Sequence, residues 1–151
     1  MAIFQFAYVI ESQMGLTNAV REAARRAAAT TTTNPNWTSL HDWTAAQLNG
    51  DGGSNPGLLA QNVQGYDAGS MWTGYPNVTF CSYDAAGVTN YRIKVEVKYK
   101  HPIFFALMSF ATDFIDGTQN DKWDLFASAE MRMENVDATE VNATGTPPVA
   151  C

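Results

Sequence analysis

The stretch from residue 3 to residue 29 carries a helical pattern that is long for a chain of 151 residues. Its apolar residues recur at steps of three and four, which predicts a single helix. They are Ile3, Phe6, Ile10, Met14, Leu16, Val20, Ala23, Ala24 and Ala27. At 1.5 Å per residue this helix would be about 40 Å long, more than one small domain needs. We expect it to run unbroken past Gly15, so any fold of this chain must be built along it.

The two halves of this helix differ in composition. Residues 1–10, MAIFQFAYVI, carry no charge, whereas the second half is rich in alanine and holds Arg21, Glu22, Arg25 and Arg26. Glu22 and Arg26 stand four residues apart in the order that stabilises a helix. We expect the arginines to face solvent, with Arg21 or Arg25 meeting a carboxylate of the rest of the chain or of another subunit. A small face is expected to pack on a sheet or a neighbour: Ala23, Ala24 and Ala27.

The remaining chain predicts a second, shorter helix and an antiparallel sheet. Threonines 30–33 and the Asn-Pro step after them end the first helix, because β-branched and pre-proline residues disfavour it. We expect a helix over Thr38–Leu48, a turn-rich loop over Asn49–Gly57 and one or two helical turns over 58–66. Alternating apolar and polar residues predict three strands, of which the first two form a hairpin. These strands cover Asn77–Tyr83, Tyr91–Lys100 and Lys122–Val136, and His101-Pro102 is expected to end the second.

The alternation assigns two faces to the predicted sheet. The apolar faces are formed by Ile93, Val95, Val97 and Tyr99 on one strand and by Trp123, Leu125, Ala127, Ala129, Met131 and Met133 on the other. The opposite face of the second strand is cationic and that of the third strand holds carboxylates, so charged side chains could pair across a solvated surface. The sequence therefore predicts an α+β fold in which the long helix lies on a small antiparallel sheet, with a short second helix and long loops.

Length and charge restrict the class of protein. A chain of 151 residues predicts one domain, and a net charge of −6 with a pI near 4.7 argues against a nucleic-acid partner, which needs a surplus of Lys and Arg. No segment reaches the ~20 apolar residues of a membrane span. The apolar connector Ile103–Phe110 is interpreted as a short buried helix or as a surface that touches a membrane or a partner subunit.

No motif in the sequence indicates catalysis, a cofactor or a metal site. His41 stands beside Asp42 as an expected surface pair, and His101 belongs to no motif. Four carboxylates near a glycine, Asp113, Asp116, Asp121 and Asp124, miss the spacing of a calcium-binding loop. Asn36, Asn77 and Asn142 lie in Asn-x-Thr sequons, for which chance matches are expected. We therefore expect no catalytic residue, no bound metal and no cofactor.

The chain has two cysteines, Cys81 and Cys151, at no metal-binding or redox spacing. They are either two unrelated buried thiols or a disulfide that holds the Pro-containing C-terminal tail. A disulfide would close a loop of about 70 residues and contribute roughly 4 kcal/mol in the chain-entropy model. It would also indicate an oxidising, extracytoplasmic compartment.

The segment IFQFAYVIESQMGLTNAVREAARRAA resembles the N-terminal signature of TadE-like pseudopilins, minor pilins of the tight-adherence (Flp-type) pilus system. Gln5-Phe6-Ala7 stands where the family has Glu-Phe-Gly. The direct matches are Leu16, Thr17, Asn18, Ala19, Arg21, Glu22, Ala24 and Arg25. The stretch LFASAEMRME is similar to the family's last strand through Ala127, Ser128, Ala129, Met131, Arg132 and Glu134. The resemblance covers about half of the chain, at both ends.

This resemblance implies a non-catalytic minor pilin or assembly component of a type IV-like pilus, which acts by subunit contacts in filament assembly or surface attachment. The chain would be one pilin-like domain, with the helix at 1–29 and an extracytoplasmic head at 30–151. A membrane helix would precede it without a break, so the protein would be anchored in the inner membrane or carried in the extracellular pilus. Its partners would be other pilin subunits, the assembly machinery and the membrane, without nucleic acid.

Residues near the N-terminus surround more than one side of the helix, so a single sheet cannot bury them all. We expect them to contact the membrane or another copy of the chain, and self-association to follow: Ile3, Phe4, Phe6, Tyr8, Val9 and Ile10. An alternative function is an extracytoplasmic module that binds glycans or other ligands. Four aromatic residues, Trp37, Trp43, Trp72 and Tyr75, would form its platform unless they are packed in the core.

Overall fold

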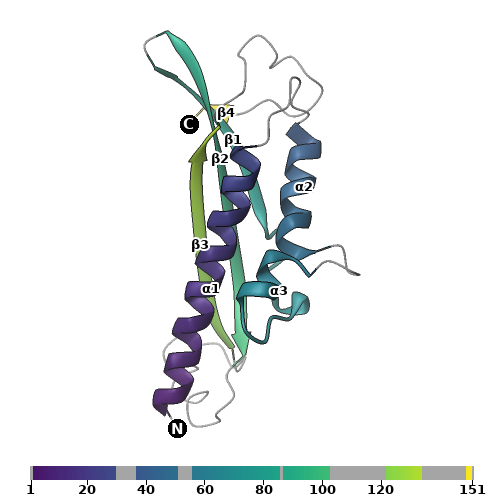
Figure 1. Cartoon of the computed structure of the whole chain (residues 1–151), viewed down its shortest axis with the longest axis vertical. Helices are drawn as coiled ribbons and strands as arrows, with labels where there is room; N and C mark the ends of the chain where they lie inside the picture. Colours follow the sequence, from purple (N-terminus) through teal and green to yellow (C-terminus); the bar gives the residue numbers. More distant parts are fainter. Residues whose placement is uncertain are drawn as a thin grey trace.

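Helix α1 (Ala2–Ala28) runs along one face of a sheet in the computed structural model of the chain, which describes residues 2–29, 37–50, 56–85, 87–102, 122–133 and 149–150. The helix is continuous past Gly15, as predicted. Figure 1 shows that it follows the length of the sheet, with its N-terminus at the end of the molecule opposite to the C-terminus.

The buried side of α1 differs from the predicted apolar stripe. The side chains that pack into the fold are Gln5, Val9, Ser12, Leu16, Ala19, Val20, Ala23, Ala24 and Ala27. In the N-terminal half, Ile3, Phe6, Ile10 and Met14 are exposed, which corrects their assignment to one core stripe with Leu16. This half carries two rows of helical spacing, and the sheet covers the row that contains the polar Gln5 and Ser12.

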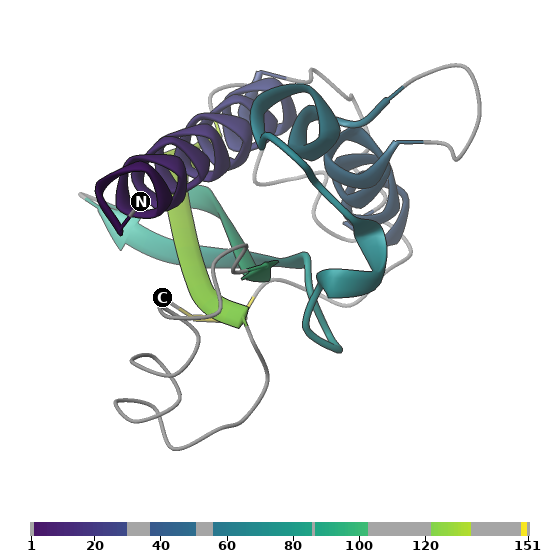
Figure 2. The same cartoon turned by 90° about the horizontal axis from the view of Figure 1, so that it is seen from below.

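Helices α2 (Trp37–Asn49) and α3 (Leu58–Asn62) lie beside α1, and a single turn of 3-10 helix, η1 (Ala68–Ser70), follows. The three α-helices lie on the same side of the sheet (Figure 2). Contact between α1 and α3 is close at Gly15, where a Cβ atom would stand 1.9 Å from the carbonyl oxygen of Asn62. Glycine at this position therefore allows α3 to approach the helix backbone.

The sheet has the strand order β3-β2-β1-β4. Its strands are β1 (Asn77–Ala85), β2 (Val88–Pro102), β3 (Lys122–Arg132) and β4 (Val149–Ala150). The first three pair in antiparallel fashion, as predicted, and the short β4 adds a parallel neighbour to β1. Helix α1 covers β2 and β3, and α2 covers β1.

Strand β2 is longer than predicted, because it begins at Val88 and continues through His101 and Pro102. Met133 donates its N–H to Tyr91 O. The backbone N–H and C=O groups of odd-numbered residues of β2 therefore bond to β3, and those of even-numbered residues point toward β1. Strand β1 extends only as far as Asn77, opposite Glu96, so it does not reach Pro102. Because β1 offers no acceptor there, the missing N–H of Pro102 costs the sheet no hydrogen bond with β1. His101 faces inward and is completely buried, which holds this end of β2 in the fold.

The two faces of the sheet are those that the alternation predicts. Ile93, Val95, Val97 and Tyr99 are completely buried. On the outer face, Arg92 of β2 binds Glu130 of β3 at 2.8 Å and Lys98 binds Asp124 at 3.4 Å. The predicted pairing of charges across the sheet is confirmed at these two places, although exposed pairs of this kind stabilise a fold by less than about 1 kcal/mol.

Strand β3 forms one edge of the sheet as far as the structure describes the chain. Since its odd-numbered residues bond to β2, the backbone groups of its even-numbered residues point to the open edge. Gln13 of α1 reaches over this edge and donates from Nε2 to the carbonyl oxygen of Phe126 at 2.8 Å. The helix thus occupies one of the hydrogen-bonding positions that an edge strand leaves free.

Several sequence-based expectations lie outside the described residues. They concern the connector 103–110, the carboxylates Asp113, Asp116 and Asp121, the sequons at Asn36 and Asn142, and the motif residue Glu134.

Candidate interaction surface on helix α1

The exposed apolar side chains of α1 form the most conspicuous surface feature of the described part of the chain. Ile3 is 83% exposed, Phe4 74%, Phe6 51%, Ile10 47% and Met14 58%. A large apolar side chain gains roughly 1.5–3 kcal/mol when it is fully buried. Contiguous apolar surface of this kind commonly marks a site of contact with a protein or a membrane.

The six contact residues expected from the sequence divide into two groups. Ile3, Phe4, Phe6 and Ile10 are exposed, whereas Val9 is 7% exposed and belongs to the core. Tyr8 is half-buried, and its ring centroid lies 5.5 Å from that of the buried His101. The expected set of contact residues included Val9 and Tyr8, which pack toward the fold. It omitted Met14, whose side chain is exposed. The signal for Met14 was its place four residues after Ile10.

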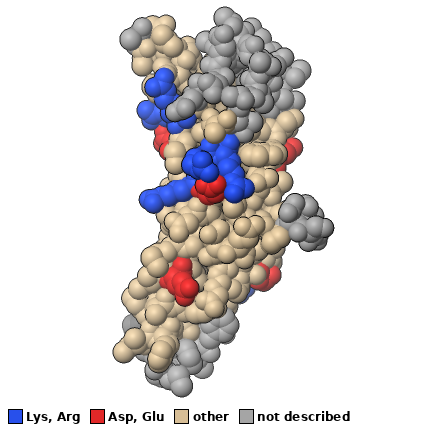
Figure 3. Space-filling model, viewed as in Figure 1, with Lys and Arg blue, Asp and Glu red and all other residues tan. Residues whose placement is uncertain are grey.

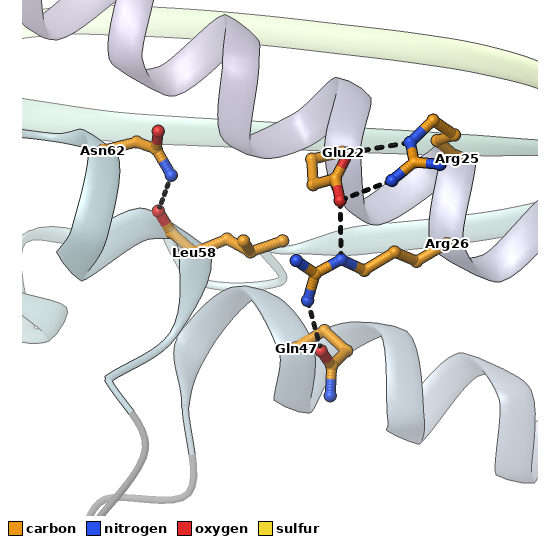
Figure 4. A network of polar contacts seen from close by, with 6 residues as sticks. All are labelled: Glu22, Arg25, Arg26, Gln47, Leu58 and Asn62. Atoms are coloured by element: carbon orange, nitrogen blue, oxygen red, sulfur yellow. Dashed lines mark hydrogen bonds and ion pairs between the residues drawn. The ribbon is translucent and has the colours of Figure 1, made fainter.

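A network of charges lies on the C-terminal half of the same helix (Figure 4). Glu22 accepts hydrogen bonds of 2.8 Å from Arg25 and from Arg26, and Arg26 also donates to Gln47 of α2 at 3.2 Å. The two guanidinium groups lower the pKa of Glu22 to about 2. The predicted pair of Glu22 and Arg26 is confirmed, while the carboxylate that Arg25 meets belongs to its own helix.

Part of the residues that carry the resemblance to pseudopilins belongs to the core that α1 and β3 help to form. Leu16, Ala19 and Ala24 are buried on the helix, and Ala127 and Ala129 are buried on the strand. Small side chains on both elements let the helix approach the sheet closely.

The other motif residues lie at the surface or at its margin. Asn18, Arg21, Arg25, Ser128 and Arg132 are exposed. Thr17 donates its hydroxyl to Gln13 O at 2.8 Å, and Met131 packs at the margin of the core.

Cys81 is disulfide-bonded. It lies on β1 directly opposite Val149 of β4, so the C-terminal strand and this cysteine are neighbours. The chain has one other cysteine, Cys151, which lies outside the described residues.

The four aromatic residues of the alternative binding site do not share one surface, although the half-buried Tyr75 donates its backbone N–H to Trp72 O at 3.1 Å. Trp37 is 2% exposed and stacks near Phe80 and Tyr91 in the core. Trp43 is 39% exposed on α2. Trp72 covers the outer face of the sheet, where the ammonium groups of Lys98 and Lys100 lie 4.0 and 4.1 Å from its ring centroid. The indole N–H of Trp72 donates to Asp124 at 3.0 Å.

The two histidines have separate surroundings. His41 contacts the carboxylate of Asp42 at 3.0 Å on the surface of α2, as expected. Burial lowers the pKa of His101, whose ring lies between Tyr8 and Tyr99. Within the ranges that the structure covers, no three His, Cys, Asp or Glu side chains lie together as metal ligands would. A surface hollow of about 290 Å³ beside Arg26 and Gln47 is lined by both polar and apolar residues, the latter including Pro56 and Leu58.

No known protein family, curated protein or solved structure matches this chain. None of the helices in the described ranges combines the length and the apolar character that crossing a membrane requires.

Proposed function

We propose that this chain is a non-catalytic, pilin-like subunit that acts through contacts with other subunits in a tight-adherence type of pilus, as a minor pilin or an assembly component. The observation that carries the proposal is the exposed apolar side of α1. Ile3, Phe4, Phe6, Ile10 and Met14 remain exposed although the core of the same helix is fully packed. A subunit whose N-terminal helix joins a filament or a membrane needs an apolar surface of this kind.

Three further observations support this proposal. The long helix lies on an antiparallel sheet, the arrangement expected of a pilin head. Residues of both sequence motifs that resemble pseudopilins are buried in one core: Ala19 and Ala24 of the helix, and Ala127 and Ala129 of β3. The disulfide at Cys81 fits an extracytoplasmic location, because disulfides persist in oxidising compartments.

The test is self-association of the full chain, measured by light scattering over a range of protein concentrations. We expect the unmodified chain to associate, and a triple variant, Ile3→Gln, Phe4→Gln and Ile10→Gln, to be monomeric with an unchanged circular dichroism spectrum. Substitution is sharper than deletion of residues 1–10, because Gln5 and Val9 are buried and their loss would also damage the core.

Phe126→Gln is the matched control, since the side chain of Phe126 is 48% exposed on the face of the sheet opposite α1, and the substitution keeps the carbonyl group that Gln13 binds. This variant should associate like the unmodified chain. A strictly monomeric unmodified chain, or a triple variant that still associates, would overturn the proposed function. Fractionation of the natural gene product with membranes or sheared pili is the corresponding cellular measurement.

A further inference from the structure

Two arginines stand directly opposite each other on the outer face of the sheet, near the hairpin that joins β1 to β2. Arg92 of β2 and Arg132 of β3 are register partners. Odd-numbered residues carry the hydrogen bonds between these strands, so the two arginines form a non-hydrogen-bonded pair, in which opposite side chains lie closest. Figure 3 shows basic side chains at the base of this hairpin, apart from those over the C-terminal half of α1. Like charges in such a position destabilise a sheet.

A single carboxylate lies within reach of this pair in the described part of the chain. Glu130 binds Arg92 at 2.8 Å. Lys94 is the register partner of Glu130 but binds Glu96, at 2.9 Å. Arg132 is exposed and forms no ion pair with any residue that the structure describes. The cluster of Arg92, Arg132 and Glu130 therefore keeps an excess of positive charge, in a chain whose net charge is −6.

Arg92 is held in place from both neighbouring strands. Its guanidinium carbon lies 4.3 Å from the ring centroid of Tyr83, which stands diagonally across from it on β1. Glu130 fixes the same group from β3. A guanidinium group has five N–H donors, more than these contacts use. Arg92 therefore offers further donors in a fixed geometry, and little ordering is needed when they bind a ligand.

The charged cluster borders a hollow in the surface. The hollow has a volume of about 360 Å³ and is lined by Tyr83, Arg92, Glu130, Met131 and Arg132. Sites for small molecules commonly measure about 300–1,000 Å³. Guanidinium groups bind carboxylates and phosphates through two parallel hydrogen bonds. Because the carboxylate of Glu130 belongs to the lining, a dianion such as phosphate meets more repulsion there than a monoanion does.

We propose that this hollow, which we call the arginine site, binds the carboxylate group of a small organic acid, up to the size of one sugar ring. Arg132 pairs with the carboxylate, and Arg92 contacts it through the donors that Glu130 leaves free. The bound anion lies between two guanidinium groups that otherwise repel each other. The inference does not depend on the proposed function, because none of these residues belongs to α1.

The test is saturation-transfer NMR of galacturonate with the full chain, which detects the ligand whether or not the chain associates. We expect binding that saturates at millimolar concentrations. Galactose, which has the same ring without the carboxylate, should not bind. Inorganic phosphate should compete only weakly, because Glu130 repels a dianion. Absence of galacturonate binding, equal binding of galactose or tighter binding of phosphate would each overturn the inference.

Substitutions of Arg132 locate the site. Arg132→Gln should weaken galacturonate binding about tenfold, because the paired hydrogen bonds and the charge are both lost. Arg132→Lys keeps the charge but not the planar pair of donors, so its affinity should fall between the two. Arg21→Gln is the matched control, since Arg21 is another exposed arginine without an ion pair in the described ranges. An equal loss of binding in Arg21→Gln would show a general attraction to basic groups and overturn the arginine site.

Thermal unfolding at a fixed protein concentration separates binding from a structural role of Arg132. Without ligand, Arg132→Gln should raise the melting temperature by about 1–3 °C, because it removes a like charge from the pair. Added galacturonate should then raise the melting temperature of the unmodified chain more than that of the variant. A variant that melts below the unmodified chain without ligand would show that Arg132 stabilises the fold, and this result contradicts the inference.

Discussion

Replacing Gly15 with alanine tests the contact between α1 and α3. In an exposed helix this change stabilises a protein by up to about 1 kcal/mol, because glycine is a poor helix former. In this fold the new Cβ atom would lie 1.9 Å from the carbonyl oxygen of Asn62 and 2.8 Å from its carbonyl carbon. Ordinary contact begins near 3.4 Å, so the backbone at Asn62 would have to retreat by about 1.5 Å, the difference from 1.9 Å.

That retreat has a cost because the atoms involved are backbone and their neighbours are buried. Leu58, Leu59 and Val63 of α3 and its C-terminal flank are 5%, 0% and 2% exposed. Forcing one extra methyl group into a packed site costs typically 1–3 kcal/mol. We therefore expect Gly15→Ala to lower the free energy of unfolding by about 2 kcal/mol, opposite in sign to the helix preference.

The measurement is urea unfolding followed by circular dichroism, under conditions where the chain is monomeric. Asn18→Gly and Asn18→Ala form the control pair, because Asn18 is an exposed position of the same helix. The difference in free energy of unfolding between these two variants measures the helix preference of alanine over glycine where no clash occurs. Asn62→Ala removes the side chain and keeps the carbonyl group, so combining it with Gly15→Ala should not restore stability. A Gly15→Ala chain as stable as the unmodified one would refute the close approach of α3.

Two further predictions concern buried or cross-linked groups. Cys81→Ser should lower the free energy of unfolding by roughly 4 kcal/mol if Cys151 is the partner, and thiol titration of the native chain should find no free thiol. Because burial lowers the pKa of His101, the unfolded chain binds a proton more readily, and stability should fall as the pH drops below about 6.5. His101→Phe should flatten this dependence between about pH 7.5 and about pH 5.5. An equally steep dependence in His101→Phe would contradict the assignment.

Much of the fold follows from periodicity that is visible in the sequence. The steps of three and four residues predicted α1, and the alternation from Tyr91 to Lys100 predicted both faces of β2. Each of these patterns repeats over many residues, so a single unusual residue does not obscure it. The end of β2 was placed too early because Pro102 was taken as a strand breaker. The missing N–H of Pro102 is harmless, since it points to a side of the strand where β1 has already ended.

The interaction surface was predicted only in outline. The sequence indicates that the first ten residues are too apolar for one sheet to cover, but periodicity does not say which of two overlapping rows the sheet will take. Burial of Gln5 and Ser12 in place of Phe6 and Met14 is decided by contacts with distant strands. The contact of Gly15 with Asn62 has the same origin, because glycine in a helical pattern gives no sign of what approaches it.

The hydrogen bond from Gln13 to the open edge of β3 has a consequence for which assemblies remain possible. An uncovered edge strand can pair with any other edge, including its own copy, and such pairing leads to amorphous or fibrillar aggregates. Gln13 occupies the carbonyl group of Phe126, near the middle of this edge. The charged side chains of Asp124, Glu130 and Arg132 flank it on the same strand. Within the described part of the chain, this hydrogen bond and these charges leave fewer positions at which β3 could pair with the edge strand of another molecule.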